Sequence, residues 1–388
     1  MKIAIFGGTF NPVHNEHVEL VKAAIKELSL DKLFIVPTFA PPHKNVVPAP
    51  AEDRLNMLKL AFSGVDKAEI SDFELKNGGK SYSYVTAEHF SGLYPEAKLC
   101  FLVGDDMLTD FKTWRFPERI LGVAELAVFG RENFTADYAA EEKYFKQTFG
   151  KTFLRLAYRG KDDSSTEIRV YSAFNLPVND KTPDKVAEYI ARNGLYRGGE
   201  YEKFLLTVLP QKRLIHTANV AVTALKKCKE LGLPERQVYV AAILHDCAKY
   251  LSPTDFPEFS LPADVPAPVV HAFLGAFVAE KVLNVRDSEI IDAIRYHTSG
   301  KANMSALGKL IFVADMLEKG RSYEGVDRLR AFYDGDFEEC FRQCLYEEVL
   351  HLKAKGRYIY VETLNAYDYY INGNRDNHDS NYDFNKKI

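Results

Sequence analysis

The sequence predicts a two-domain protein, with an α/β domain built on a parallel sheet followed by an all-α domain. Three observations lead to this prediction. The chain has 388 residues, and folds tend to divide beyond roughly 250 to 300 residues. Its first half alternates short β-rich apolar runs with helical patterns, whereas the second half keeps a period near 3.6. We expect domains at residues 1–198 and 199–372, and a polar, solvated tail at 373–388.

The parallel sheet follows from the order of elements in the first half. Apolar runs typical of strands occupy Ile3 to Phe6, Leu33 to Val36 and Leu99 to Val103. A helical pattern from Val18 to Leu28 separates the first two runs. Strands that alternate with helices in this way form a parallel sheet with crossover helices.

The boundary between the domains is expected at a glycine-rich segment. A helical pattern ends at Asn193-Gly194, where glycine is a common stop signal, and Arg197-Gly198-Gly199-Glu200 is the expected linker. Beyond it, helical patterns cover Val220 to Leu231, Val238 to Tyr250, Val270 to Leu283, Ile290 to Tyr296, Leu307 to Leu317 and Phe337 to Lys353.

Composition restricts the class of protein. With 46% hydrophobic and 27% charged residues the chain is typical of a soluble globular protein, and its net charge of −4 argues against a nucleic-acid partner. No apolar run approaches the roughly 20 residues that span a bilayer, and no signal peptide is evident, so we expect a cytoplasmic protein without a membrane partner. The five scattered cysteines are expected to be reduced thiols.

Residues 7–17, Gly7-Gly8-Thr9-Phe10-Asn11-Pro12-Val13-His14-Asn15-Glu16-His17, predict an anion site. The segment follows a strand and opens a helix near His14. Glycines let a phosphate approach the backbone, and a helix amino terminus offers unpaired N–H groups and a favourable dipole. His14 and His17, three residues apart, face one spot and could stabilise a phosphoryl group in transfer. The alternative is that His14 caps the helix and His17 lies on the surface.

This string resembles the G-G-T/S-F-x-P-x-H-x-G-H signature of the nucleotidyltransferase superfamily that includes the nicotinate-nucleotide adenylyltransferases, whose sheet is Rossmann-like. The resemblance extends over residues 1–196. Its further motifs are Pro42-His43-Lys44, then Glu74, Gly79, Ser81, Tyr82 and Thr86, then Phe101 to Asp106 with Phe111 and Trp114, then Ser164-Ser165-Thr166-Glu167-Ile168-Arg169, and finally Asn193-Gly194-Leu195-Tyr196.

The resemblance implies that nicotinate mononucleotide attacks the α-phosphate of ATP, that pyrophosphate leaves with Mg²⁺, and that deamido-NAD forms. The implied catalytic residues are His14, His17, Lys44 and Arg169. The implied ATP-binding residues are Gly7, Gly8, Thr9, Phe10, His14, His17, Gly104, Asp106, Ser165, Thr166 and Arg169. The implied residues for nicotinate mononucleotide are Lys44, Thr86, Asp106 and Trp114.

Each motif also has a plainer interpretation. Ser165 and Thr166 can cap a helix that binds polyphosphate beside Arg169, although a helix cap without a ligand would look the same. Lys44 can be a solvated loop lysine, and Trp114 can be a core residue.

Several positions depart from the family pattern. Glu16 replaces a glycine between the two histidines, and we expect its carboxylate to point away from ATP, which it would otherwise repel. Asn77 replaces an arginine, Ser83 a threonine and Val85 an aspartate. These changes leave the preferred pyridine substrate open.

A second set of polar residues interrupts the apolar helices of the second half: His216, His245, Asp246, His271, His297 and Asp315. Each unpaired group would cost several kcal/mol to bury, so a shared partner is needed, and metal ions fit histidine and aspartate together. One such histidine alone is more often a core or surface residue, and an isolated aspartate a helix cap.

The order H…HD…H…H…D over residues 200–365 resembles the HD phosphohydrolase superfamily. The strings around it look like the bacterial branch that cleaves diadenosine tetraphosphate symmetrically: Arg213-x-x-His216, Ile243-Leu244-His245-Asp246-x-Ala248-Lys249, Ile294-Arg295-Tyr296-His297-Thr298-x-Gly300 and Ala314-Asp315-x-x-Glu318-x-x-Arg321.

The HD resemblance implies a two-metal site and favours iron, although the ligand types also suit manganese and zinc. Asp246 would bridge the ions, with His216, His245 and Asp315 on one and His271 and His297 on the other. Lys249 would hold a substrate phosphate. Glu318 and Arg321 can support metal ligands or phosphate, or be surface residues of a helix end.

The sequence therefore predicts a bifunctional enzyme that makes deamido-NAD and hydrolyses diadenosine tetraphosphate to ADP. One alternative is a helical half that senses a nucleotide without hydrolysing it. Another keeps two enzymes but changes the substrates, with nicotinamide mononucleotide or phosphopantetheine as acceptor and another phosphorylated nucleotide in the second half. The oligomeric state and any coupling between the sites stay open.

Overall fold

A computed structural model describes residues 1–39, 48–132, 136–161 and 164–373 of the chain. The chain divides into two compact units. The first contains Met1–Ser172 and Pro177–Arg197, and the second contains Ala173–Leu176 and Gly198–Ile388. Lys44 and its motif neighbours lie outside the described residues, as does the predicted tail beyond residue 373.

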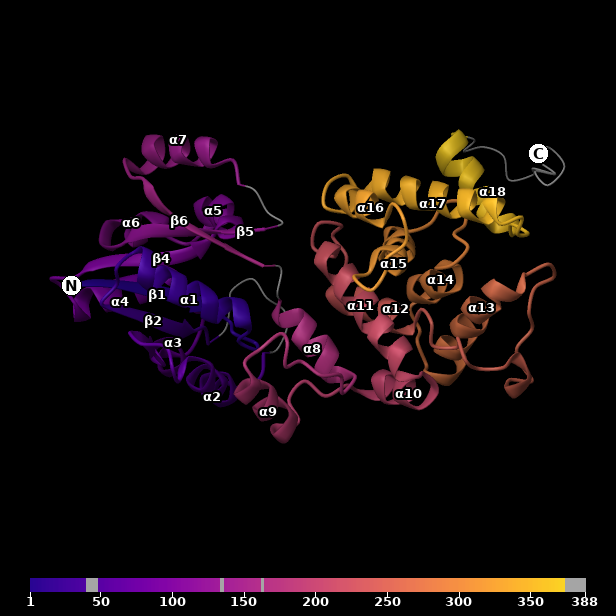
Figure 1. Ribbon diagram of the computed structural model, residues 1–388, viewed down its shortest axis with the longest axis horizontal. Coiled ribbons are helices and arrows are strands. Elements are labelled where there is room, and N and C mark those ends of the chain that lie inside the picture. The colour runs from indigo at the N-terminus through magenta and orange to yellow at the C-terminus, as the bar shows by residue number, and fades with distance from the viewer. Residues whose placement is uncertain (40–47, 133–135, 162–163, 374–388) are drawn as a thin grey trace. The chain divides into compact units, whose positions relative to one another are not determined.

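The first unit contains a six-stranded parallel sheet in the order β3-β2-β1-β4-β5-β6 (Figure 1), so the predicted α/β fold is confirmed. The strands are β1 (Lys2–Gly8), β2 (Lys32–Pro37), β3 (Ala68–Ile70), β4 (Lys98–Gly104), β5 (Glu125–Arg131) and β6 (Phe153–Gly160). The interiors of the four central strands β2, β1, β4 and β5 are continuous apolar runs because both faces of a parallel sheet are covered, whereas the edge strands β3 and β6 include charged residues.

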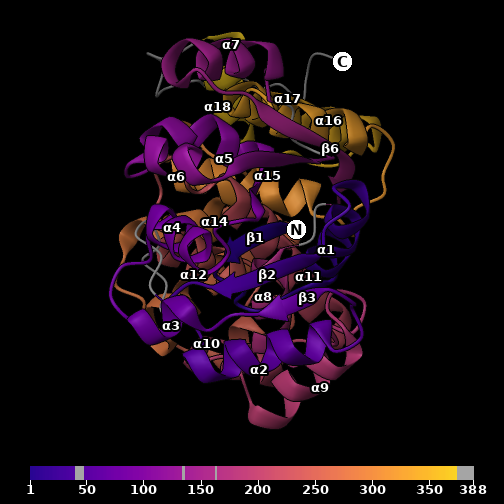
Figure 2. The ribbon, with the colours of Figure 1, turned by 90° about the vertical axis from the view of Figure 1, so that its left-hand side faces the viewer.

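Helices connect the strands and cover both faces. They are α1 (Asn15–Glu27), α2 (Ala51–Phe62), α3 (Phe73–Asn77), α4 (Ser83–Leu93), α5 (Asp105–Asp110), α6 (Pro117–Val123), α7 (Tyr138–Phe149), α8 (Ser165–Ala173) and α9 (Asp184–Asn193). Figure 2 shows α1 on one side of the sheet and α4 and α6 on the other. On the α4 and α6 side, Phe34, Phe90 and Phe101 belong to one buried cluster. Helix α9 ends at Gly194 in a left-handed conformation (φ 61°), as its glycine predicts.

The strand order places a topological switch point between β1 and β4. The chain leaves β1 toward β2 on one side and leaves β4 toward β5 on the other. Open α/β sheets bind ligands outside the carboxyl ends of the strands at such a point. The turn after Gly8 and the turn after Gly104 both lie there.

The second unit is helical throughout its described residues. Its helices are α10 (Glu200–Val208), α11 (Gln211–Lys227), α12 (Glu235–Leu244), α13 (Val270–Phe277), α14 (Ser288–Tyr296), α15 (Ala306–Leu317), α16 (Val326–Tyr333), α17 (Phe337–Ala354) and α18 (Val361–Tyr367). Helix α11 packs against α12 and α15, and α14 packs against α12, α13 and α15. The predicted all-α domain is confirmed.

Helix α12 ends at Leu244, before the predicted end at Tyr250. The next residues form tight turns whose hydrogen bonds span three residues, from Cys247 N–H to Leu244 and from Lys249 N–H to Asp246. The apolar pattern continues through these turns, and the sequence gives no sign of the change. Across the described ranges, no helix is both long and apolar enough to cross a membrane.

Candidate active sites

The turn after β1 stacks His14 and His17 on each other. His14 is the residue before α1, and its main-chain N–H donates to Nδ1 of His17 at 3.1 Å. The ring centroids lie 3.5 Å apart. A glutamate or glutamine usually accepts this bond in a capping box, and here an imidazole does. Because Nδ1 of His17 accepts a hydrogen bond, the proton of the neutral ring lies on Nε2.

His14 is neutral in this site at ordinary pH. Burial, with a smaller contribution from the charge of Arg131, lowers the pKa of His14 to about 3. Its Nδ1 is buried and has no hydrogen-bond partner within the described part of the chain. The pair therefore offers hydrogen-bonding nitrogens to a ligand, and His14 carries charge only if an anion raises its pKa.

Phe10 and the two glycines shape the space beside the histidines. Phe10 is 2% exposed and contacts the ring of His17 edge to face, with centroids 5.0 Å apart. A Cβ atom on Gly8 would lie 2.9 Å from the Phe10 ring, whereas one on Gly7 would enter open space. Gly8 thus allows the packing that supports His17, and Gly7 leaves room at the strand end.

Two arginines hold the same turn by its main-chain carbonyls. Arg169 donates to the carbonyl of Asn11 at 2.8 Å and to Thr166 Oγ1 at 3.0 Å. Arg54 is 1% exposed and donates to the carbonyls of Thr9 and Thr38 at 2.9 and 2.7 Å. The motifs did not indicate Arg54. The sequence did contain a signal that Arg54 is buried. Arg54 lies three and four residues before the buried Met57 and Leu58, which places it on the buried face of α2.

Ser164, rather than Ser165 or Thr166, caps helix α8. Its hydroxyl accepts from the N–H of Glu167 at 3.2 Å. Ser165 begins the helix and donates to the carbonyl of Pro12 at 2.7 Å. The predicted cap is therefore wrong by one residue. The reason is that Ser165 is used to tie α8 to the turn after β1.

The end of β4 brings two adjacent aspartates to the same edge of the sheet. Asp105 is fully buried, accepts from the N–H groups of Asp106 and Arg131, and has a raised pKa because of burial. Asp106 Oδ1 is buried without a hydrogen-bond partner, and its Oδ2 lies 3.7 Å from an Arg131 nitrogen. A Cβ on Gly104 would lie 2.4 Å from Asp106 Oδ1. Glycine there lets this carboxylate fold back over the strand end.

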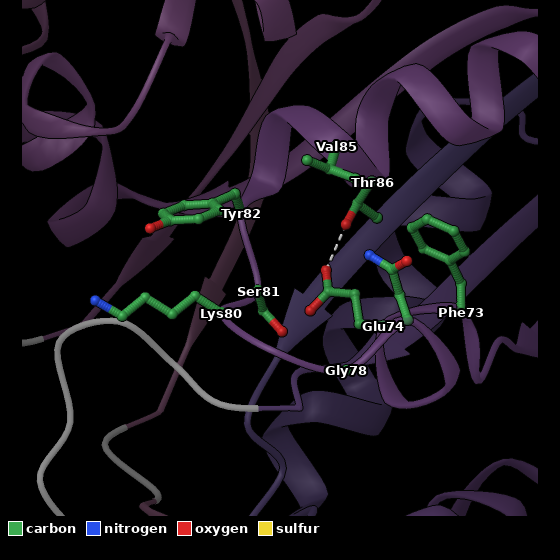
Figure 3. Close-up of a pocket in the computed structure, with 9 residues that line it drawn as sticks. Phe73, Glu74, Gly78, Lys80, Ser81, Tyr82, Val85 and Thr86 are labelled. Carbon is green, nitrogen blue, oxygen red and sulfur yellow. Dashed lines mark hydrogen bonds between the residues drawn. The ribbon is translucent and has the colours of Figure 1, made fainter.

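A pocket opens at the amino terminus of α4 (Figure 3). It is lined by Phe73, Glu74, Asn77, Gly78, Lys80, Ser81, Tyr82, Val85 and Thr86. Thr86 is 1% exposed and its hydroxyl donates to Glu74 Oε1. Burial raises the pKa of the Glu74 carboxyl group, and the hydrogen bonds from Thr86 and Ser81 oppose this shift. Among the residues that the structure describes, no side chain caps α4, and its first turn has no acidic residue.

Trp114 packs on the core beside this pocket. Its indole is half-buried and lies edge to face with Phe101, with centroids 6.3 Å apart, and 5.2 Å from the ring of Phe111. The core interpretation of Trp114 therefore holds for the part of the indole that packs on Phe101 and Phe111.

Glu16 is hydrogen-bonded to β6 and to the residue that follows this strand. Its Oε2 accepts from the Tyr158 hydroxyl at 2.5 Å and from the Lys161 N–H at 2.9 Å. The carboxylate that replaces the family's glycine is thus hydrogen-bonded within the protein. Its orientation relative to bound ATP stays a prediction.

In the second unit, the six residues predicted as metal ligands converge. Three overlapping groups have ligand atoms within 4.8 Å of one another: His216, His245 and Asp246; His245, His297 and Asp315; and Asp246, His271 and His297. Each residue comes from a helix or from the turn that ends it. Asp246 belongs to two of the groups.

Asp246 lies at the centre of this set. Its Oδ1 lies 3.1 Å from His271 Nε2 and 3.6 Å from His297 Nε2, and its Oδ2 lies 3.6 Å from His245 Nε2. Oδ1 is buried and accepts no hydrogen bond of ordinary geometry. A buried carboxylate oxygen without a hydrogen bond, among imidazole nitrogens, fits divalent metal ions.

The partners of Nδ1 orient these imidazoles. Nδ1 of His245 lies 2.7 Å from the carbonyl of Ala242, and Nδ1 of His297 lies 2.8 Å from that of Ile294. A carbonyl only accepts, so each Nδ1 carries the proton and each Nε2 presents a lone pair. This is the tautomer that a metal ligand needs.

Charges around the site shift several pKa values. Burial lowers the pKa of His245, and it lowers that of His271 to about 4. Burial also opposes the protonation of His216, but hydrogen bonds to Asp315 and Glu318 outweigh it and raise its pKa. Asp315 has a lowered pKa because the interactions with His216, His245 and Arg321 outweigh its burial.

Cationic and hydroxyl groups rim the ligand set. Lys249 Nζ lies 3.0 Å from His271 Nε2, and Arg213 donates to Asp246 Oδ2 at 2.8 Å. Arg321 donates to Asp315. The Thr298 hydroxyl lies 3.0 Å from His297 Nε2. Among these, Lys249 was predicted as a site residue, and the sequence left Arg321 between a residue that supports metal ligands or phosphate and a surface residue. Thr298 lies in one of the strings that resemble the HD superfamily, and this was the signal that could have placed its hydroxyl at the site.

Comparison with known families agrees with both halves. Residues 5–170 match the family described as cytidylyltransferase-like, and residues 213–320 match the HD domain. The chain is therefore a protein in which a nucleotidyltransferase domain precedes an HD domain. A Mycoplasma genitalium protein named "Probable nicotinate-nucleotide adenylyltransferase/Ap4A hydrolase" is 30% identical over 329 residues, which are 83% of this chain and 89% of that protein. The chain belongs to this two-domain family.

Two further relatives match one half each. A Clostridium tetani protein named "Probable nicotinate-nucleotide adenylyltransferase" is 39% identical over 198 residues, covering 50% of this chain and 99% of that protein. A crystal structure described as a predicted HD superfamily hydrolase involved in NAD metabolism, from Clostridium acetobutylicum, is 27% identical with a TM-score of 0.41. It covers 45% of this chain and 98% of that one.

Proposed function

We propose that the chain is a bifunctional enzyme. Its first domain transfers the adenylyl group of ATP to nicotinate mononucleotide, forming deamido-NAD and pyrophosphate, and its second domain hydrolyses diadenosine tetraphosphate symmetrically to ADP. The observation that carries the proposal is the presence of two separate sets of functional residues in one chain, a histidine pair at a strand-turn-helix and six metal-ligand residues around Asp246. The two-domain family supports both activities.

In the first domain, the glycine turn and the α1 amino terminus would hold ATP. We assign Gly7, Gly8, Thr9, Phe10, His14, His17, Gly104, Asp106, Ser165, Thr166 and Arg169 to ATP, with Phe10 acting by packing under His17. His17 would donate from Nε2 to a phosphate oxygen, and His14 lies stacked beside it. Arg169 and the predicted Lys44 would balance charge on the leaving pyrophosphate, which Mg²⁺ accompanies. No covalent step on the protein is needed.

The pocket at α4 supports nicotinate as the pyridine. A carboxylate is favoured at a helix amino terminus that has no side-chain cap and no acidic residue in its first turn. Thr86, Asp106 and Trp114 would shape this site together with Lys44. The hydroxyl proton of Thr86 is already used for Glu74, so Thr86 would contribute its main chain and its shape rather than a donated hydroxyl.

In the second domain, His216, His245, Asp246 and Asp315 would hold one divalent ion, and Asp246, His271 and His297 a second. We propose iron for both positions. Two such ions supply positive charge for the phosphate and an acidified water as nucleophile. Lys249, beside His271 at the rim, would bind a substrate phosphate. The complete ligand set is what favours hydrolysis over nucleotide sensing alone.

A substrate panel on the intact chain tests both halves. Purified protein should form deamido-NAD from ATP and nicotinate mononucleotide, and ADP from diadenosine tetraphosphate, with metal content measured on the same sample. Nicotinamide mononucleotide and phosphopantetheine serve as competing acceptors. Preference for either acceptor would contradict the pyridine assignment, and bound metal without turnover of any nucleotide would contradict the hydrolase.

A further inference from the structure

Glu318, which follows α15, is buried against the metal-ligand residue His216. Its side chain belongs to a residue that is 3% exposed, and its Oε1 lies 3.1 Å from Nδ1 of His216. The two residues are 102 positions apart in the sequence. Both oxygens of the carboxylate face hydrogen-bonding groups, because Oε2 accepts from the Asn219 side chain and from the Gly320 N–H.

His216 differs from His245 and His297 in the group that faces its Nδ1 atom. Those two histidines bind main-chain carbonyls through Nδ1, whereas His216 binds a carboxylate. We propose that Glu318 is a positioning residue that keeps the His216 proton on Nδ1 and so directs the Nε2 lone pair of His216 to the metal ion shared with Asp315. The inference rests on the proposed metal site and adds to it the residue on which one of the two ions depends.

Glu318 is itself held in a single orientation. Its second oxygen, Oε2, accepts from Asn219 Nδ2 at 2.8 Å and from the main-chain N–H of Gly320 at 2.6 Å. A Cβ on Gly320 would lie 3.0 Å from both carboxylate oxygens. The close turn at Gly320 brings its N–H to the carboxylate. Oε2 thus accepts from two donors. Oε1 faces the imidazole and lies 3.8 Å from Arg321 Nε, which itself donates to the Asp315 carbonyl.

This arrangement makes the amide substitution more damaging than truncation. In Glu318→Gln, the amide oxygen must take the position facing Asn219 and Gly320, because an NH₂ group there would meet two donors. The NH₂ group would then face Nδ1 of His216 and donate to it. His216 would be forced into the tautomer with its proton on Nε2, which cannot bind the metal. Glu318→Ala only removes the acceptor and leaves space for water.

Mn²⁺ binding to the intact chain tests the proposal. We expect two Mn²⁺ ions per wild-type chain, with the EPR spectrum of a coupled pair. Glu318→Ala should weaken one of the two by about 10-fold, and Glu318→Gln by about 100-fold, the range seen when a group that supports a metal ligand is lost. The spectrum of Glu318→Gln should become that of single ions. A purely structural role would reverse the order, because Ala removes more of the side chain than Gln does.

Glu202→Gln is the matched control. Glu202 is also a buried carboxylate of this unit, and it accepts from the Tyr239 hydroxyl and the Gly199 N–H, but it is not a ligand. This variant should keep both ions. The proposal would be overturned if either folded Glu318 variant bound two Mn²⁺ ions with wild-type affinity. It would also be overturned if Glu318→Ala lost more Mn²⁺ affinity than Glu318→Gln. No Mn²⁺ binding by the wild type would instead refute the metal site, and two ions without hydrolysis would refute only the substrate.

Discussion

The two histidine groups of this protein use opposite nitrogens. In the first unit, Nδ1 of His17 accepts a main-chain N–H, so its Nε2 carries a proton. In the second unit, Nδ1 of His245 and His297 donates to main-chain carbonyls, so Nε2 carries a lone pair. A proton suits a phosphate oxygen, and a lone pair suits a metal ion.

The difference shows that the local main chain, and not the residue type, sets the tautomers of His17, His245 and His297. A helix amino terminus has unpaired N–H groups, and a helix carboxyl terminus has unpaired carbonyls. His17 lies in the first turn of α1, whereas His245 and His297 follow the last turns of α12 and α14. For these three histidines, the end of the helix at which the residue lies therefore determines whether Nε2 carries a proton or a lone pair.

The largest expected effect is the loss of one activity without any change in the other. Asp246→Asn should reduce hydrolysis of diadenosine tetraphosphate at least about 1,000-fold, because the central carboxylate would no longer bridge two ions. Formation of deamido-NAD, measured on the same sample, should be unchanged. Retained hydrolysis, or loss of both activities in a folded variant, would show that the division into two chemistries is wrong.

Substitution of His17 tests the proton-donor half of the comparison. Glutamine and glutamate both accept the His14 N–H, so both should preserve the start of α1. Glutamine keeps an N–H donor, whereas glutamate places a negative charge by the phosphate. We expect His17→Glu to lower kcat/KM for adenylyl transfer about 100- to 1,000-fold and His17→Gln considerably less. Equal losses in the two variants, with equal thermal stability, would contradict a donor role for Nε2.

Much of the fold and of each site could be predicted from local patterns. The parallel sheet and the helical half follow from apolar periodicity, and the six ligand residues converge because each ends or interrupts an apolar helix. What could not be predicted depends on contacts between distant segments. The sequence left Glu318 between a residue that supports metal ligands and a surface residue, and its contact with His216 arises because α11 packs on α15. Ser165 leaves the cap position to reach the Pro12 carbonyl. The role of Lys44, outside the described residues, stays a prediction.

The smallest expected effect is a pH dependence of stability. The folded pKa of His14, about 3, lies below its ordinary value of 6.5, so the unfolded chain binds more protons between these limits. The contribution of neutral His14 is therefore complete above pH 6.5 and is lost as the pH falls toward 3. Denaturation of the wild type and of His14→Asn should be measured at pH 7 and pH 5. The free energy of unfolding should decrease less in the variant than in the wild type as the pH falls. The difference is at most about 1.4 kcal/mol per pH unit. Identical decreases would show that His14 titrates normally.

The comparison itself is tested most directly by long-range ¹H–¹⁵N correlation spectra of the histidine side chains in the metal-free protein, recorded where the rings are neutral. The account predicts that His17 has its proton on Nε2 and that His245 and His297 have theirs on Nδ1. A His17 ring protonated on Nδ1, or a His245 ring protonated on Nε2, would contradict the claim that main-chain groups at the helix ends set the tautomers of these three histidines.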